Sequence, residues 1–231
     1  MKEYYKALFG TRSGADRNLE YKIGEINIAE KWNPGEEDPV KCGGFNFSDE
    51  RSILRWLIRG DTIYKVAIPE DAEVIEVKNP YGIKGCYRTN KIILTDPVPV
   101  TDDVALKLYE KSCMPDVAYY KTLAGLAIRG CEKACMRIIE DKISIDNIDE
   151  VIKEVTDFIG PNEYNKGNNA VYNKVMFYLL SMKNSQMFLN TLYNKSREKQ
   201  ENREYIAVPI FENPEKLKID IKSDTEQKTE Q

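Results

Sequence analysis

Histidine is absent from the whole chain of 231 residues. Catalytic sites that depend on an imidazole base or ligand are therefore excluded, among them Ser-His-Asp and Cys-His triads and histidine-based metal centres. A catalytic group would have to come from Glu, Asp, Lys, Tyr, Cys or Arg. This absence restricts the available chemistry more than any other property of the sequence.

Long apolar runs are also missing. Runs such as MFYLLSM at Met176–Met182 are much shorter than the roughly 18 to 20 residues that a membrane helix needs. The N-terminal MKEYYKALFG lacks the apolar core of a secretory signal peptide. We therefore expect a cytoplasmic protein that does not use a membrane as a partner.

Cysteine is scarce, and the five residues are scattered without a paired framework, which suits a reducing compartment. Cys131 and Cys135 lie one helical turn apart and could contact a metal. Structural zinc usually takes four N or S ligands, however, and this chain offers no imidazole. Because free cysteine is among the most buried residue types, core packing is the simpler interpretation, and we expect no metal site.

The composition is otherwise that of a globular protein, with 42% hydrophobic and 31% charged residues. The formal net charge of -4 differs from the basic surface of a general nucleic-acid binder. The net charge excludes neither a local basic patch nor a protein partner.

Strand-like and turn-like segments dominate the first hundred residues. Apolar residues alternate with polar ones from Leu19 to Ile28, which predicts one bent strand or two short ones. Ser48 is a good helix N-cap, Asp49 and Glu50 complement the positive end of a helix, and Gly60 would end that helix. The other predicted strands, rich in β-branched and aromatic residues, are Glu3–Phe9, Thr62–Ile68, Glu73–Val77 and Lys91–Leu94.

Helical spacing of apolar residues begins at Thr101, after the segment DPVPV, which reads as an exit from the sheet and a domain boundary. Short helices should follow Thr101, Pro115 and Gly130. Longer helices are predicted at 146–159 and about 168–199, followed by strands at 204–211 and 216–221.

The fold class expected is therefore α+β: a small mixed or antiparallel sheet with one helix, followed by a mainly α-helical region and short C-terminal strands. We place an α+β sheet domain at 1–100 and a helical region at 101–200. Returning strands occupy 201–222 and a disordered tail 223–231.

Two glycine-containing segments are candidate ligand-binding sites. Gly43 and Gly44 could let a ligand approach the backbone beside the N–H groups that follow Ser48, although two glycines before a strand are commonly a turn. No phosphate-binding loop or dinucleotide glycine motif accompanies them. Arg12 and Ser13 could meet a phosphate or carboxylate, and ordinary surface-loop chemistry explains them as well.

Three arginines form a possible basic patch. Arg51, Arg55 and Arg59 recur every four residues, so on an α-helix they would make one basic stripe opposite the apolar face. Such a stripe would suit RNA or DNA binding, which predicts strong salt dependence.

Residues 42–95 resemble the core of the ADP-ribosyltransferase superfamily through GFNFS, the helix after it, IYKVAIPEDAEVIEV and the final NKIIL. The resemblance implies a nicotinamide-nucleotide cleft in which Arg12 contacts NAD and Ser48 closes the first motif. The family's catalytic Glu would fall where this chain has Asn90 and Lys91. The whole chain is also similar to uncharacterised proteins of low-GC Gram-positive bacteria and their phages, which implies no activity.

The leading hypothesis is an intracellular binding or interaction protein, of phage or mobile-element origin, on a degenerate ADP-ribosyltransferase-like scaffold. Its partner would be another protein, with no cofactor and no assigned catalytic residue. One alternative is an NAD-using ADP-ribosyltransferase-like enzyme with a displaced acid such as Glu73 or Glu76. A second alternative is a nucleic-acid-binding protein.

Overall fold

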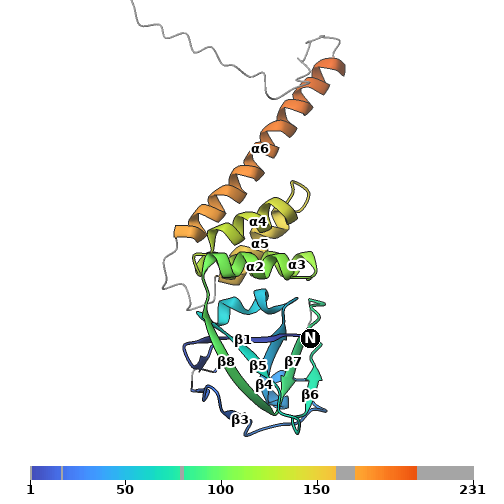
Figure 1. Cartoon of the computed structure of the whole chain (residues 1–231). Coiled ribbons are helices and arrows are strands. Elements are labelled where there is room, and N and C mark those ends of the chain that lie inside the picture. Colours follow the sequence, from blue (N-terminus) through green and yellow to red (C-terminus); the bar gives the residue numbers. More distant parts are fainter. Residues whose placement is uncertain (1, 17, 79–80, 160–169, 202–231) are drawn as a thin grey trace, which may run out of the picture. The chain divides into compact units, whose positions relative to one another are not determined.

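The computed structural model describes residues 2–16, 18–78, 81–159 and 170–201 (Figure 1). By its internal contacts the chain divides into two compact units, Met1–Gln186 and Met187–Gln231. The first unit joins an antiparallel sheet to a set of helices, so the predicted α+β class is confirmed. The strands and tail expected from residue 202 onward lie outside the described residues, and Glu201 ends the last helix.

Eight strands form one antiparallel sheet in the order β3-β8-β5-β1-β4-β7-β6, and the short β2 pairs with β1 (Figure 1). Strand β1 changes its neighbour along its length: Tyr4 and Tyr5 pair with β4, whereas Leu8 and Phe9 pair with β2. The bounds are β1 Tyr4–Phe9, β2 Arg12–Ser13, β3 Ile26–Ile28, β4 Phe45–Asp49, β5 Thr62–Ala67, β6 Val74–Glu76, β7 Cys86–Thr89 and β8 Lys91–Pro99.

The two faces of this sheet supply two separate cores, because successive strand residues point to opposite faces. On one face Phe47 and Leu94 pack with Tyr21 from the segment that leads to β3. On the other face Ile63 and Cys86 join the apolar side chains of the helices. The sheet is therefore covered on both sides, by a loop segment on one and by helices on the other.

The chain between β4 and β5 differs from the prediction. Ser48 does not cap a helix: it pairs with Tyr5 inside β4, which extends to Asp49. The helix that follows Ser52 is a 3-10 helix, η1, at Ile53–Arg59. The predicted α-helix with Ser48 as its N-cap is therefore wrong, because pairing with β1 holds residues 48 and 49 extended.

The DPVPV segment, expected to leave the sheet, belongs mostly to β8. Val98 still pairs with Ile63, and the register shifts between that pair and Lys65, where two residues of β8 oppose one of β5. Asp96, with φ +48°, and Pro97 form this bulge. A bulge is one of the few places where a sheet tolerates proline, because the extra residue is not needed as a donor.

The helices begin close to the residues that sequence signals indicate. Thr101 caps α2 by accepting the N–H of Val104 at 3.3 Å. In Figure 1, η1 lies between the sheet and the helices α2 to α5, and it packs against β1 and α3. The bounds are α1 Pro39–Cys42, α2 Asp102–Lys111, α3 Asp116–Ile128, α4 Glu132–Lys142, α5 Ile148–Ile159 and α6 Ala170–Glu201.

The start of α4 is capped from another helix. Its N-cap residue, Cys131, makes no side-chain cap bond. Instead, the carboxylate of Asp102 in α2 accepts the N–H groups of Lys133 and Ala134 at 2.8 and 3.1 Å. One carboxylate thus satisfies two N–H groups that a helix start leaves without partners, and joins α2 to α4.

Within the described ranges, none of the helices combines the length and the apolar character needed to cross a membrane.

Candidate functional site

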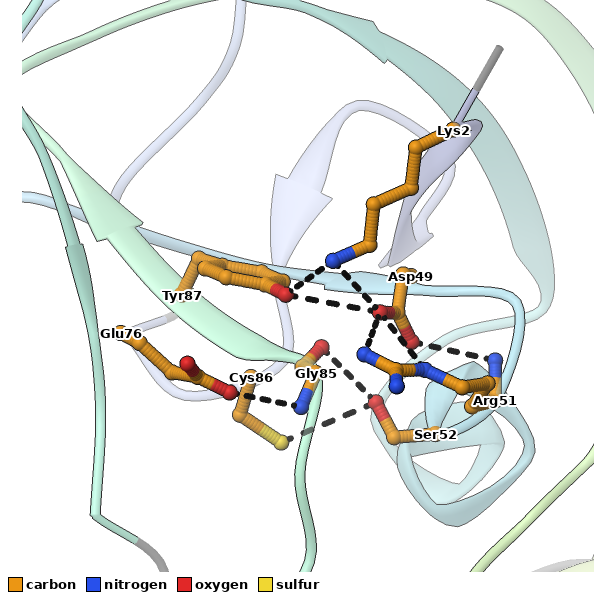
Figure 2. Close-up of polar contacts among 8 residues, drawn as sticks. All are labelled: Lys2, Asp49, Arg51, Ser52, Glu76, Gly85, Cys86 and Tyr87. Atoms are coloured by element: carbon orange, nitrogen blue, oxygen red, sulfur yellow. Dashed lines mark hydrogen bonds and ion pairs between the residues drawn. The ribbon is translucent and has the colours of Figure 1, made fainter.

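A buried carboxylate at the end of β4 organises the polar cluster in Figure 2. The side chain of Asp49 is 1% exposed. Its Oδ2 accepts from Nε and Nη2 of Arg51 at 3.1 and 2.6 Å, and its Oδ1 accepts the backbone N–H of Arg51 at 3.1 Å. The ammonium of Lys2 lies 3.1 Å from Oδ2. These bonds compensate for taking a carboxylate out of water.

Gly85 makes room for this carboxylate. A Cβ at Gly85 would lie 2.2 Å from Oδ1 of Asp49, far closer than atoms approach. The Gly85 carbonyl accepts the N–H of Asp49 and the hydroxyl of Ser52, each at 2.9 Å, and its N–H donates to Glu76 at 3.2 Å (Figure 2). Strands β4 and β7 and the start of η1 are thereby fixed around Asp49.

The two cations stay about half exposed, at 45% for Lys2 and 42% for Arg51. Lys2 donates a short hydrogen bond to the Tyr87 hydroxyl and lies 4.7 Å from the centre of that ring. The bond to Tyr87 raises the pKa of Lys2, and the bonds to Asp49 raise the pKa of Arg51. Both side chains are therefore fixed positive charges at neutral pH.

The chemistry of this cluster suits recognition better than reaction. Its one buried carboxylate, Asp49, already accepts from both cations, so it is badly placed to take a proton from a substrate. The nearby thiol of Cys86 is buried and lies 3.8 Å from the Ser52 hydroxyl. What faces solvent is a pair of cations held in a fixed arrangement.

The cluster is also bonded to the helical region. The backbone N–H of Cys113, between α2 and α3, donates to the carbonyl of Arg51 at 3.0 Å. Cys113 is exposed, whereas the other cysteines, Cys42, Cys86, Cys131 and Cys135, are buried.

The structure does not bring the predicted ligand-binding residues of the two segments together. Arg12 is exposed and pairs with Glu20 at 3.8 Å. Ser13 is buried, and its hydroxyl accepts the N–H groups two and three residues further on, at 3.2 Å each, as in a local turn. Arg12 pairs with Phe9 whereas Ser48 pairs with Tyr5, so four residues of β1, about 13 Å, separate them along the strand.

Gly43 and Gly44 are both left-handed, with φ +71°. A Cβ on Gly43 would lie 2.3 Å from the carbonyl oxygen of Lys31, and one on Gly44 would lie 2.6 Å from the ring of Trp32. The chain itself fills the space beside both glycines, which favours the turn interpretation over a ligand cradle.

The three arginines of the predicted basic stripe lie in different environments. Arg51 precedes η1 and bonds to Asp49. Arg55 is buried, and burial lowers its pKa to about 10. Arg59 is exposed and lies 5.9 Å from the centre of the Trp56 ring. Because a 3-10 helix repeats every three residues, a four-residue spacing does not place them on one face.

Sequence reasoning missed the cluster because its members come from separate segments. Asp49 was assigned to a helix start, and nothing local connects it with Lys2, Gly85 or Tyr87. One signal was present: Phe45, Phe47 and Asp49 alternate as they would in a strand, which is how they lie in β4.

A feature of a different kind lies on the second unit. In this part of α6, four large apolar side chains within six residues are between 48% and 64% exposed, and we call them the α6 apolar surface: Met187, Phe188, Leu189 and Leu192. At about 100° per residue, they spread over more than half of the helix circumference.

Comparison with protein-family models, with curated proteins and with solved structures finds no match for this chain.

Proposed function

We propose that the chain is a binding protein whose partner, another protein, docks on the α6 apolar surface. The observation that carries the proposal is the exposure of Met187, Phe188, Leu189 and Leu192. A helix that is apolar over most of its circumference is normally buried, and contiguous exposed apolar side chains mark interaction sites. The residues between them, Asn190 and Thr191, are uncharged, so the partner surface should also be apolar.

Burying the α6 apolar surface would supply part of the binding energy of a complex. Fully burying one side chain of this size contributes about 1.5 to 3 kcal/mol, and about half of each remains to be buried. Four such side chains together supply several kcal/mol towards the cost of association. We propose that the protein acts in the cytoplasm without a cofactor. We also propose that it is built on a degenerate ADP-ribosyltransferase-like scaffold and is of phage or mobile-element origin.

The two alternatives have less support. For an NAD-using enzyme, Arg12 and Ser48 are too far apart along β1 to share one ligand group. The displaced acids are also engaged, since Glu73 accepts the indole N–H of Trp32 at 2.9 Å and Glu76 accepts the N–H of Gly85. For a nucleic-acid binder, the burial of Arg55 removes the centre of the basic stripe.

The proposal can be tested with a photo-crosslinking amino acid at Phe188 in the full chain, expressed in cells. We expect a defined protein to be crosslinked, and we expect Leu192→Glu to abolish the crosslink. The control Asn190→Glu places the same charge on the same turn outside the apolar surface, and should leave the crosslink intact.

The crosslinked product also distinguishes the occupants of this surface. A product of twice the chain mass indicates a second copy, and a crosslink to residues 202–231 indicates this chain's own C-terminal segment; either result would contradict a different protein as the partner. Crosslinking no stronger than from the same probe at exposed Asn173 would contradict a docking surface altogether.

A further inference from the structure

The polar cluster around Asp49 contains two cations that are rich in hydrogen-bond donors. An ammonium has three N–H donors and a guanidinium five. Asp49 accepts two donors of Arg51 and one of Lys2, and Tyr87 accepts a second from Lys2. Tyr87 also interacts with the guanidinium of Arg51. The remaining N–H groups belong to two side chains that are about half exposed.

The two cations of the cluster share one ion-pair partner, Asp49. The second acid of the cluster, Glu76, bonds to the N–H of Gly85 and pairs with neither cation among the described residues. Glu3 and Glu50, adjacent in sequence, each pair at 3.4 Å with a lysine outside the cluster. The exposed parts of Lys2 and Arg51 are therefore a local site of attraction for an anion.

From these observations we propose that Lys2 and Arg51 bind the phosphate group of a small phosphorylated ligand. A phosphate offers several acceptor oxygens with the spacing of a guanidinium edge, and charge-assisted bonds to it are strong. Arg51 presents its other N–H groups on the side away from Asp49. Lys2 adds a second charge beside them.

The buried carboxylate makes this arrangement more than a chance pair of surface cations. Asp49 holds the guanidinium through two bonds to one oxygen, and its own position is fixed by Gly85 and Ser52. Much of the rotational freedom that a free surface arginine would lose on binding is thus already lost. This proposal is independent of the α6 apolar surface.

A titration of the full, isotope-labelled chain with inorganic phosphate at constant ionic strength tests the proposal. The Nε–H signal of Arg51 should shift and saturate. The control is Arg137, which is 53% exposed, bonds through Nε to Asp141 at 3.1 Å and lies 3.7 Å from Glu140, so it is an ion-paired arginine without a second cation. Its signal should not saturate with phosphate.

Two variants sharpen the result. Lys2→Met leaves the bonds between Arg51 and Asp49 in place and should weaken phosphate binding about tenfold, whereas Arg137→Met should leave it unchanged. Phenyl phosphate then tests whether the ligand extends over Tyr87, by binding more tightly than phosphate alone. The proposal is overturned if the Arg51 signal does not respond, if Arg51 and Arg137 respond alike, or if Lys2→Met binds phosphate as the wild type does.

Discussion

At the scale of single residues, Lys6 is a buried ammonium at the point where β1 changes its neighbour. Its Nζ donates to the carbonyl of Asn46 and lies 5.1 Å from the centre of the Tyr21 ring. Burial lowers the pKa of Lys6 to about 7, and the positive charges of Arg88 and Arg59 contribute to this shift. Lys6 thus connects β1 to β4 beyond the last backbone pair of these two strands. Its surroundings disfavour the charged form of the side chain.

This environment makes stability depend on pH. The pKa of Lys6 is about 7 in the folded chain and about 10.4 when unfolded. Between these values the unfolded state binds more protons, so the free energy of unfolding should rise with pH, by up to about 1.4 kcal/mol per pH unit from this group. Lys6→Met should remove that contribution.

Urea unfolding at pH 7, 8 and 9 measures the effect as the difference between wild type and variant, in which other titrating groups cancel. Lys65→Met, at a half-exposed position on the neighbouring strand, should keep the wild-type slope. An identical pH slope in the wild type and in Lys6→Met would show that Lys6 titrates as an ordinary exposed lysine.

A second prediction concerns Gly85. Both Gly85 and Gly24 have φ +79°, but nothing lies within 4 Å of a Cβ at Gly24. Alanine at either position would have to adopt the left-handed backbone conformation, which costs about 1 to 2 kcal/mol. Gly85→Ala must also displace the buried Asp49 carboxylate, so we expect it to lose about 3 kcal/mol or more in chemical unfolding. Equal losses in the two variants would mean that the cluster adapts without cost.

At the scale of elements, Asp102 links two helices. Asp102→Ala would remove the acceptor of two N–H groups at the start of α4, and we expect a loss of about 1 to 2 kcal/mol. The adjacent Asp103 only pairs with the exposed ammonium of Lys133 at 2.7 Å, so Asp103→Ala should cost less than about 0.5 kcal/mol. Thermal unfolding of both variants checks the contrast, and similar losses would argue against a capping role.

The helices and strands also differ in how well the sequence predicts them. Helices such as α2 were found because their signals are local: a capping Thr101 and apolar side chains at helical spacing. Strand β5 was found because TIYKVA is β-branched and aromatic. Strand β7, with the sequence CYRT, is too short to show a pattern and is specified by pairing with β4 and β6. The end of β4 was misplaced for the same reason, since its pairing partner lies more than forty residues earlier.

The candidate site was harder to predict than the fold. Asp49 was visible only as a polar residue after two aromatics. Lys2 precedes β1 and reaches Asp49 because Tyr4 pairs with Asp49 across the sheet. The requirement for glycine at position 85 depends on a carboxylate that arrives from another strand. Contacts of this kind follow from strand register, which local periodicity does not determine.

At the scale of the whole molecule, both apolar cores that the structure describes lie in the first unit, and their last buried member is Leu179. A fragment of residues 1–186 should therefore unfold cooperatively, with a urea midpoint close to that of the full chain. It should also lose capture of the proposed protein partner, because it lacks the α6 apolar surface. A fragment that does not fold would show that the second unit contributes to the stability of the first.

The exposure of Cys113 gives this molecule a built-in attachment point for a fluorescent reporter. Only a thiolate reacts readily with a maleimide dye, and burial raises the pKa of Cys131 to about 11 and that of Cys135 well above its usual value. Cys113 is the exposed thiol, and its backbone is bonded to the carbonyl of Arg51. One dye on the unaltered chain would thus be attached close to the backbone of Arg51, and its emission could be tested as a report of anion binding at the proposed site.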